Sequence, residues 1–470
     1  MPTPAAGSQP ADHASDSSCD QAASSDHTAL AARRDLAVRA AVAEGLLTAE
    51  HPVAALLDVA TVRERARALR AAFEEVAAPG QRVLHTFAAK AAALVPVLRL
   101  LAAEGLGCEA ASPGELALAR AAGVAPSRTV LDSPAKTTAE LREALALGVV
   151  VNVDNPQELA RLDGLLTDTM TSSPLGVRVN PQLGAGAIDA MSTATATSKF
   201  GVGLRDPGAR EWLVQAYVDR PWLTALHTHT GSQGVPLSLM AAGVRELYTL
   251  AEEVNAAAGR RQVTVLDLGG GLPVDFSRDE PSPDFGDYAR LLAAEVPGLF
   301  SGAYALTTEF GRALLARAGL VLTRVEYTKE TGGRPIAVTH AGVQVAARTV
   351  FAPEAWPLRV RAYDQQGAPK AGEPVAQDLA GPACFAGDLT ARDRKLPLLH
   401  PGDHAALLDT GAYYATNHFA YNSLPRPGIY GYRADPATGT TRFATLRRPQ
   451  SLAEIVAEGG GAYGTGLTDL

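Results

Sequence analysis

Short strand-like segments alternate with longer helical segments from about residue 80 to residue 310, and this alternation restricts the fold more than any other feature. The helical stretches, such as TTAELREALALG, place Ala and Leu at helical spacing. Eight strands alternating with helices over roughly 250 residues are the expected order and size of a (β/α)8 barrel, so we predict an α/β fold of the TIM-barrel type. An open doubly wound sheet is the alternative, but its GxGxxG motif does not follow the first strand. The eight predicted strands are 82–88, 107–110, 129–131, 150–153, 174–179, 222–227, 263–268 and 304–308.

The pattern changes after residue 311, where strand-like segments follow one another with Pro- and Gly-rich loops and without helices between them. This change predicts a second, all-β domain of the sandwich or barrel type. We assign residues 61–311 to the barrel and residues 312–470 to the β domain, and we expect residues 28–60 to pack on the β domain. The strands predicted in the β domain are 321–330, 334–340, 358–364 and 404–411.

Charge and composition narrow the possible partners. The formal net charge is −8, from 42 basic and 50 acidic residues, which argues against nucleic acid or an anionic membrane surface as a partner. No apolar run approaches the ~20 residues that span a bilayer. Residues 1–27 are small, polar and acidic, and they lack the basic start and apolar stretch of a secretory signal. We expect these residues to form a disordered tail and the protein to be cytoplasmic.

Lys90 follows the first predicted strand, at the end where a TIM barrel carries its working residues. Among neutral neighbours its ammonium form would be disfavoured, so we expect a lowered pKa and a nucleophilic amine. A surface lysine at a strand end is the structural alternative.

Further candidates follow the later strands. Three glycines at 269–271 come after the seventh strand, where backbone N–H groups with no Cβ nearby could approach an anion, and Ser232 could donate a further hydrogen bond. Glu309 ends the eighth strand and needs a partner if it is buried. That partner is either a protonated ring nitrogen or Arg312, three residues further on.

His227 and His229 share one face of an extended segment, which is compatible with a metal site. No further cluster of ligands accompanies them, so we expect no metal and instead ring stacking or a core role. Cys19, Cys108 and Cys384 have unrelated spacings and predict neither a disulfide framework nor a zinc site.

Nine motifs occur in order between about residue 80 and residue 430, over most of the chain. Together they resemble the fold-type III pyridoxal-phosphate decarboxylases, the family of the diaminopimelate and ornithine decarboxylases. The pattern is most similar to that of the diaminopimelate decarboxylases. The motifs are FAAKA, GCEAASPGEL, NVDNPQEL, RVNP followed by SKFG, HTHTGSQ, LDLGGGLP, EFGR, GPACFAGD and GAYYATNHFAYNSLPRP.

The resemblance implies pyridoxal 5′-phosphate as the cofactor and gives the candidates their roles. Lys90 would carry the cofactor, His229 would stack on its ring, and Glu309 would pair with the pyridinium nitrogen. Alanine racemases have an arginine at that last position, which weakens the ring as an electron sink, so Glu309 favours decarboxylation. The implied reaction loses CO2 from an external aldimine to give a quinonoid. The implied cofactor-binding residues are Lys90, Arg178, His229, Ser232, Gly270, Gly271, Glu309, Gly311, Arg312 and Tyr413.

The resemblance also implies a homodimer with shared active sites, whose small-molecule substrate is an amino acid. Cys384, contributed by the neighbouring subunit, would be the acid that protonates the α-carbon of the substrate. The implied catalytic residues are therefore Lys90, Cys384, Glu309 and His229. The residues expected at the substrate are Arg312, Arg348, Phe385 and Asp388.

Four motifs depart from the family pattern. Diaminopimelate decarboxylases usually have Cys-Glu-Ser where this chain has Cys384 followed by Phe385 and alanine. The tyrosine of their Arg-Pro-x-Leu-Tyr is Ala352, the proline of Glu-Pro-Gly-Arg is Phe310, and the aspartate after the second strand is Glu109. A pocket that loses polar groups selects against substrates that need them.

These departures predict a substrate other than diaminopimelate, namely an L-amino acid with an apolar or otherwise different side chain. However, Arg312 and Arg348 remain in this chain and could bind a distal carboxylate. Diaminopimelate decarboxylation therefore stays open, as do other reactions of the same fold on a carrier-tethered substrate. A catalytically silent binding protein is the alternative outside enzymes.

Overall fold

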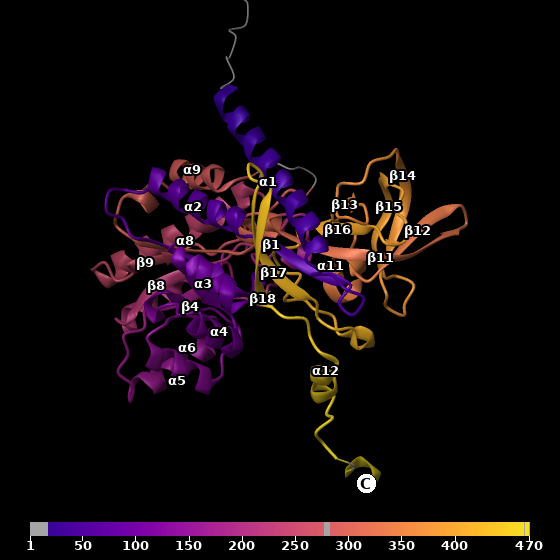
Figure 1. Cartoon of the computed structure of the whole chain (residues 1–470). Helices are drawn as coiled ribbons and strands as arrows, with labels where there is room; N and C mark the ends of the chain where they lie inside the picture. Colours follow the sequence, from indigo (N-terminus) through magenta and orange to yellow (C-terminus); the bar gives the residue numbers. More distant parts are fainter. Residues whose placement is uncertain (1–16, 277–282, 465, 470) are drawn as a thin grey trace, which may run out of the picture.

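Eight parallel strands close into a barrel in the computed structural model, which describes residues 17–276, 283–464 and 466–469 (Figure 1). The strands are hydrogen-bonded in the order β5-β4-β3-β2-β10-β9-β8-β6, and pairing of β5 with β6 closes the ring. The predicted TIM-type fold is confirmed, and each predicted strand overlaps an observed one. The barrel strands are β2 (Val83–Ala88), β3 (Gly107–Ala110), β4 (Thr129–Leu131), β5 (Val150–Val153), β6 (Leu175–Asn180), β8 (Leu223–Thr228), β9 (Val265–Asp267) and β10 (Ala305–Phe310), and a short β7 (Val202–Gly203) also pairs with β6.

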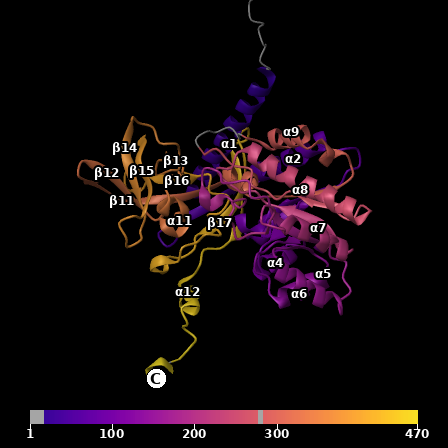
Figure 2. The same ribbon diagram turned by 180° about the vertical axis from the view of Figure 1, so that it is seen from behind.

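Helices follow most of the barrel strands and cover the outside of the ring (Figure 2). Several begin and end where the sequence supplies a cap. Thr137 and Glu140 form a capping box at the start of α5, and Gly148 ends the same helix with a left-handed φ of 75°. The helices are α2 (Val59–Val76), α3 (Val95–Ala103), α4 (Pro113–Ala121), α5 (Thr138–Leu147), α6 (Pro156–Leu166), α7 (Ala209–Asp219), α8 (Leu237–Ala258), α9 (Phe285–Glu295) and the short α10 (Arg312–Leu315).

A second, nine-stranded sheet forms the β domain, beside the barrel in Figure 1. All four strands predicted there are present, and five more join them. One of these five, β1, comes from before the barrel and lies between β11 and β17. Two helices, α11 (Val343–Phe351) and α12 (Leu452–Glu458), also belong to this part of the chain. The strands are β1 (Val53–Asp58), β11 (Gly319–Thr331), β12 (Arg334–Thr339), β13 (Val360–Tyr363), β14 (Pro374–Ala380), β15 (Leu389–Pro397), β16 (His404–Leu408), β17 (Gly428–Asp435) and β18 (Thr440–Arg447).

The N-terminal helix α1 (Ser17–Ala43) contacts the strands β17 and β18 of this sheet. Its buried residues Ala37 and Val38 belong to the same apolar cluster as Leu56 of β1 and Tyr432 of β17. An ion pair of 2.7 Å between Arg33 and the buried Asp58 fixes the helix further. Of the tail expected at residues 1–27, residues 1–16 lie outside the described residues, and from Ser17 onward the chain is helical.

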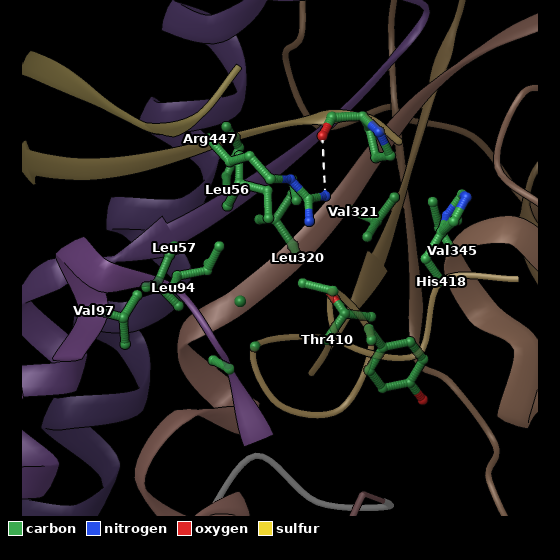
Figure 3. Close-up of a pocket in the computed structure, with 18 of the residues that line it drawn as sticks. Leu56, Leu57, Leu94, Val97, Leu320, Val321, Val345, Thr410, His418 and Arg447 are labelled. Carbon is green, nitrogen blue, oxygen red and sulfur yellow. Dashed lines mark hydrogen bonds between the residues drawn. The ribbon is translucent and has the colours of Figure 1, made fainter. Parts of the chain in front are cut away.

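An apolar pocket marks the seam between the barrel and the β domain (Figure 3). Leu94 and Val97 line it from the barrel side, and Leu320 and Val321 of β11 line it from the sheet. Arg447 closes one side and donates a hydrogen bond of 3.3 Å to the carbonyl of Pro427. The two domains meet at this pocket, next to the carboxyl end of β2, and Lys90 follows that strand in the chain. Among the described helices, none is long and apolar enough to cross a membrane.

Candidate active site

A cavity lies where the carboxyl ends of the barrel strands meet the β domain. It measures roughly 810 Å³, including the part open to solvent, which is in the range of small-molecule sites. Nine of the fourteen residues predicted for the site line it. They are Lys90, His229, Ser232, Gly271, Glu309, Gly311, Arg312, Arg348 and Tyr413. Arg178, Gly270, Cys384, Phe385 and Asp388 do not line the cavity.

Lys90 stands in a 3-10 turn (Ala89–Ala91) directly after β2. Its Nζ donates a hydrogen bond of 2.5 Å to Oε2 of Glu109, a buried residue of β3. Burial works against the ammonium form, but Glu109, Tyr413 and Glu309 outweigh it and raise the pKa of Lys90. The prediction of a lysine among neutral neighbours with a lowered pKa was therefore wrong. The error arose because β2 and β3 are adjacent in the barrel, which brings Glu109 to Lys90.

His229 presents an uncharged ring to the cavity. Its Nδ1 accepts a hydrogen bond of 3.1 Å from the backbone N–H of Gly270, so that nitrogen carries no proton. Burial and the cations Arg178 and Lys90 hold the pKa of His229 well below its usual value. The imidazole is thus fixed in orientation and neutral over the physiological pH range.

Glu309 lies at the end of β10 with 4% of its surface exposed. Its Oε1 is buried and has no hydrogen-bond partner among the described residues. Burial, and then the neighbouring carboxylate of Asp267, raise the pKa of Glu309 well above its usual value. The ion pair with Arg312 that was the structural alternative does not form within the described ranges. A buried carboxyl oxygen without a partner needs a donor from a bound molecule.

His227 lies behind Glu309, inside the barrel, and has no exposed surface. Its Nε2 is 3.2 Å from Asp132 Oδ2 and 3.9 Å from Glu309 Oε2, and its Nδ1 is 3.4 Å from Asp267 Oδ1. Burial opposes its charge, but these three carboxyl groups raise the pKa of His227 well above its usual value. Sequence reasoning gave His227 a core or stacking role and missed both aspartates, because neither belongs to a motif that indicates chemistry.

Arg178 pairs with the same aspartate, at 2.9 Å from Asp132 Oδ2. Arg178 and His227 outweigh the effect of burial and hold the pKa of Asp132 well below its usual value. Ligand atoms of Asp132, His227 and Glu309 lie within 4.8 Å of one another, a spacing that also suits a metal ion. Because Arg178 already neutralises Asp132, the cluster is better described as a buried charge network.

The glycines after β9 leave room that no other residue would. A Cβ on Gly271 would lie 1.9 Å from the carbonyl oxygen of Gly231, and the φ of Gly271 is 102°. A Cβ on Gly270 would lie 2.1 Å from the carbonyl oxygen of Glu309. The N–H of Gly270 already donates to His229 Nδ1, so the close backbone approach offers an anion the backbone around Gly271. Tyr413 stands nearby with an unusual φ of 66°, held by a hydrogen bond of 2.7 Å from its N–H to the carbonyl of Ala91.

Arg312 and Arg348 place two cations beside this backbone. Arg312 has 4% of its surface exposed, and burial together with Arg348 lowers its pKa to about 10. Arg348 is half-buried, and burial lowers its pKa too. Arg312 Nε and Arg348 Nη1 are buried without a hydrogen-bond partner. In the part of the chain that the structure describes, no carboxylate pairs with either guanidinium, so both are available to an anionic ligand.

The family model of the pyridoxal-binding domain of pyridoxal-dependent decarboxylases matches residues 59–316, more than half of the chain. The chain belongs to this family, the fold-type III decarboxylases. It is a pyridoxal-phosphate-dependent carboxy-lyase, as the motifs predicted. Its family membership also confirms pyridoxal 5′-phosphate as the cofactor.

Curated relatives of this decarboxylase span nearly its whole length. The diaminopimelate decarboxylase of Pseudomonas aeruginosa is 34% identical over 380 residues, which cover 80% of this chain and 86% of the relative. That of Methanothermobacter thermautotrophicus is 31% identical over 414 residues, 84% of this chain and 91% of the relative. The crystal structure of Helicobacter pylori diaminopimelate decarboxylase complexed with L-lysine superposes with a TM-score of 0.76, at 24% identity, over 87% of this chain and 97% of that one. At that identity it supports the fold alone.

The cavity of this decarboxylase fits the family's cofactor. The unpartnered Oε1 of Glu309 suits a protonated ring nitrogen, and the neutral ring of His229 suits an aromatic face. The open backbone around Gly271 suits a phosphate.

The residues predicted on the β-domain loop lie apart from the cavity of the same chain. Cys384 is exposed, and its backbone N–H donates to Asn422 Oδ1 at 2.8 Å. Asp388 is buried, and its two carboxylate oxygens accept hydrogen bonds from the N–H groups of Ala383 and Val343 at 2.7 and 2.6 Å. Asp388 therefore holds the loop that carries Cys384 against the start of α11.

Proposed function

We propose that this decarboxylase removes CO2 from diaminopimelate to give L-lysine. The observation that carries the proposal is the pair Arg312 and Arg348, two largely buried cations that line the cavity with Lys90 and have no anionic partner within the described ranges. A substrate with a carboxylate at each end supplies one anion to these arginines and the other to the reaction. An apolar amino acid would leave the Arg348 guanidinium without an anion, since of the two arginines only Arg312 is also proposed to bind the cofactor phosphate, and this costs free energy.

The curated relatives support the same substrate. They are named diaminopimelate decarboxylases. The substrate with an apolar side chain, predicted from Phe385 and Ala352, is less well supported. The lyase activity does not depend on that choice.

The proposed cofactor contacts follow from the geometry. Lys90 supplies the amine that holds the cofactor, and Glu109 keeps that amine in place through its hydrogen bond. His229 packs its neutral ring against the cofactor ring, and Glu309 accepts the hydrogen bond of the ring nitrogen. The phosphate is proposed to bind to Ser232, Gly270, Gly271, Gly311, Arg312 and Tyr413. Bound in this way, pyridoxal phosphate acts as the electron sink that accepts the electron pair left by CO2.

The surrounding residues orient the substrate and exclude water. Arg312 and Arg348 bind the far carboxylate and set the distance between it and Lys90. Phe200 lines the cavity and stacks on Arg178, whose guanidinium carbon is 4.4 Å from its ring centroid. The apolar ring of Phe200 lowers the dielectric constant of the cavity, which strengthens the hydrogen bond proposed for Glu309.

We further propose a homodimer in which Cys384 of the partner subunit serves the cavity. Cys384 is exposed on the β domain and does not line the cavity of its own chain. The next residue, Phe385, belongs to a cluster of four aromatic rings, which we call the aromatic patch: Phe351, Phe385, Phe419 and Tyr421. Phe351 is 61% exposed and Tyr421 is 43% exposed, so a second copy of the chain would bury an apolar surface here.

Complementation tests the shared site. Lys90→Ala and Cys384→Ala variants are each expected to lose most activity, and their mixture is expected to recover up to about a quarter of it, because a mixed dimer contains one intact site. A mixture as inactive as its components would refute the shared site.

The cytoplasmic location stays a prediction.

CO2 release from meso-diaminopimelate by the purified, cofactor-loaded protein tests the function. L-Lysine is the expected product, and apolar and basic L-amino acids run alongside are expected to react at least a hundredfold more slowly. Faster release from an apolar amino acid would overturn the proposed substrate but leave the lyase activity in place. Failure to take up pyridoxal phosphate at all would favour a silent binding protein.

A further inference from the structure

The ring of Trp356 contacts both arginines that line the cavity. It lies in the segment between α11 and β13, with 6% of its surface exposed, and does not line the cavity. The guanidinium carbons of Arg312 and Arg348 lie 4.6 and 5.0 Å from its ring centroid. A hydrogen bond of 3.0 Å from its backbone N–H to the carbonyl of Ala352 fixes the segment that carries it.

Tyr413 contacts the same two groups. The guanidinium carbons of Arg312 and Arg348 lie 4.6 and 4.7 Å from the Tyr413 ring centroid. All four cation–ring distances are within the 6 Å or so at which the ring quadrupole attracts a cation. The four residues come from separate parts of the chain: α10, α11, the segment after α11 and the loop after β16.

Aromatic rings stabilise these cations in a way that a carboxylate would not. Two guanidinium groups side by side repel each other, and burial together with the neighbouring Arg348 lowers the pKa of Arg312. A carboxylate would relieve that repulsion but would also occupy the N–H donors that a ligand needs. The faces of the rings attract the cations and leave the N–H donors free.

We propose that Trp356 is a positioning residue that, with Tyr413, holds Arg312 and Arg348 ready for a carboxylate ligand. Trp356 does not touch the ligand and acts only through the two arginines. The proposal rests on the proposed function for the identity of the substrate, but the binding of a dicarboxylate to the arginine pair can be measured without turnover.

Steady-state kinetics separate positioning from general support of the fold. Trp356→Leu is expected to raise the KM for meso-diaminopimelate about tenfold or more and to change kcat less than threefold, since a desolvated cation–π contact accounts for at least this much binding. Trp356→Phe keeps a ring and is expected to restore most of the affinity. Trp212→Leu, on the outer barrel helix α7, is the matched control and is expected to leave KM unchanged.

The proposal would be overturned if Trp356→Leu lost kcat and thermal stability without a change in KM. It would also be overturned if Trp356→Phe behaved like Trp356→Leu. An unchanged KM in Trp356→Leu would refute the positioning role and leave the proposed function intact.

Fluorescence provides a readout without turnover. The chain contains three tryptophans, so Trp212→Phe with Trp222→Phe leaves Trp356 as the only tryptophan in the holoenzyme, and its emission is followed with excitation that tyrosine does not absorb. Pimelate, a dicarboxylate with no amino group to react with the cofactor, is expected to change that emission saturably, and hexanoate is expected to have at least tenfold less effect at equal concentration. Emission that pimelate leaves unchanged would overturn the proposal. A pimelate response in a protein that does not decarboxylate diaminopimelate would refute only the proposed substrate.

Discussion

The ammonium group of Lys90 is hydrogen-bonded to the buried carboxylate of Glu109, with 2.5 Å between Nζ and Oε2. The lysine that is expected to hold the cofactor is therefore stored as a cation. Its pKa is raised above the usual value, so before cofactor binding the reactive free amine is a minor form at neutral pH.

Glu109→Gln removes the charge that stabilises the ammonium form and keeps a hydrogen-bond acceptor. The pKa of Lys90 is expected to fall, because burial then acts with less opposition. The rate at which the apoprotein captures pyridoxal phosphate, followed by absorbance across a pH series, should reach its half-maximum at a lower pH in the variant. Glu104→Gln, which removes a carboxylate that pairs with Arg67 on the outside of the barrel, is the control. A half-maximum that stays in place or rises would contradict the role given to Glu109.

His227→Gln tests the buried charge network. The substitution leaves Asp132, Asp267 and Glu309 without their shared cation, and it is expected to destabilise the barrel by about 3 kcal/mol. The folded-state pKa of His227 is raised above the reference value of 6.5, so its stabilising effect is complete below pH 6.5 and is lost as the pH rises through the folded-state pKa. The thermal midpoints of native protein and variant should differ most in mildly acidic buffer and converge in alkaline buffer. A difference that grows with pH would show that His227 is neutral.

Gly271→Ala tests the backbone cradle. The added Cβ would collide with the carbonyl of Gly231, and the left-handed φ of Gly271 strains any other residue. We expect the cofactor dissociation constant to rise at least tenfold, or about 1.4 kcal/mol, in an absorbance titration. Gly123→Ala has a similar backbone strain, with a φ of 79°, but meets no atom within 4 Å. If both substitutions raised the cofactor dissociation constant equally, backbone strain alone would account for the loss of cofactor affinity.

Phe385→Glu tests the loop that departs from the family pattern. Phe385 stacks on Phe351, with ring centroids 5.9 Å apart and an interplanar angle of 9°, in the aromatic patch. Restoring the family's glutamate is expected to raise kcat/KM for meso-diaminopimelate several-fold, through contact with the far end of the substrate in the cavity of the partner subunit. Phe419→Leu, in the same patch, should not raise it. An unchanged kcat/KM in Phe385→Glu would show that other residues determine the substrate specificity of the enzyme.

Much of the barrel could be predicted because each of its strands is a short apolar segment followed by a helical one. In the β domain, β1, β14, β15, β17 and β18 were not predicted. β15 reads LTARDRKLP, with charged and exposed residues between buried ones, so it lacks the apolar run that identified the others. β1 was expected only as part of a segment that packs on the β domain and not as a strand of its sheet, since its sheet partners β11 and β17 follow it by more than 250 residues.

The site was predictable where it follows strand ends, as for Lys90, His229 and Glu309. What sequence spacing could not supply was contact between neighbouring strands and between separate segments. Glu109 reaches Lys90 across a strand pair, and Trp356 reaches Arg312 from the segment after α11. Neither residue stands in a motif that ties it to its partner.

The position of β1 has a consequence for how the chain is made. Strand β1 pairs antiparallel with β11 and parallel with β17, so residues near position 55 become interior only after residues near position 430 have left the ribosome. The barrel strands, by contrast, are all synthesised by residue 310. The barrel thus has all its strands early in synthesis, while the N-terminal strand waits for nearly the whole chain before its sheet can close around it.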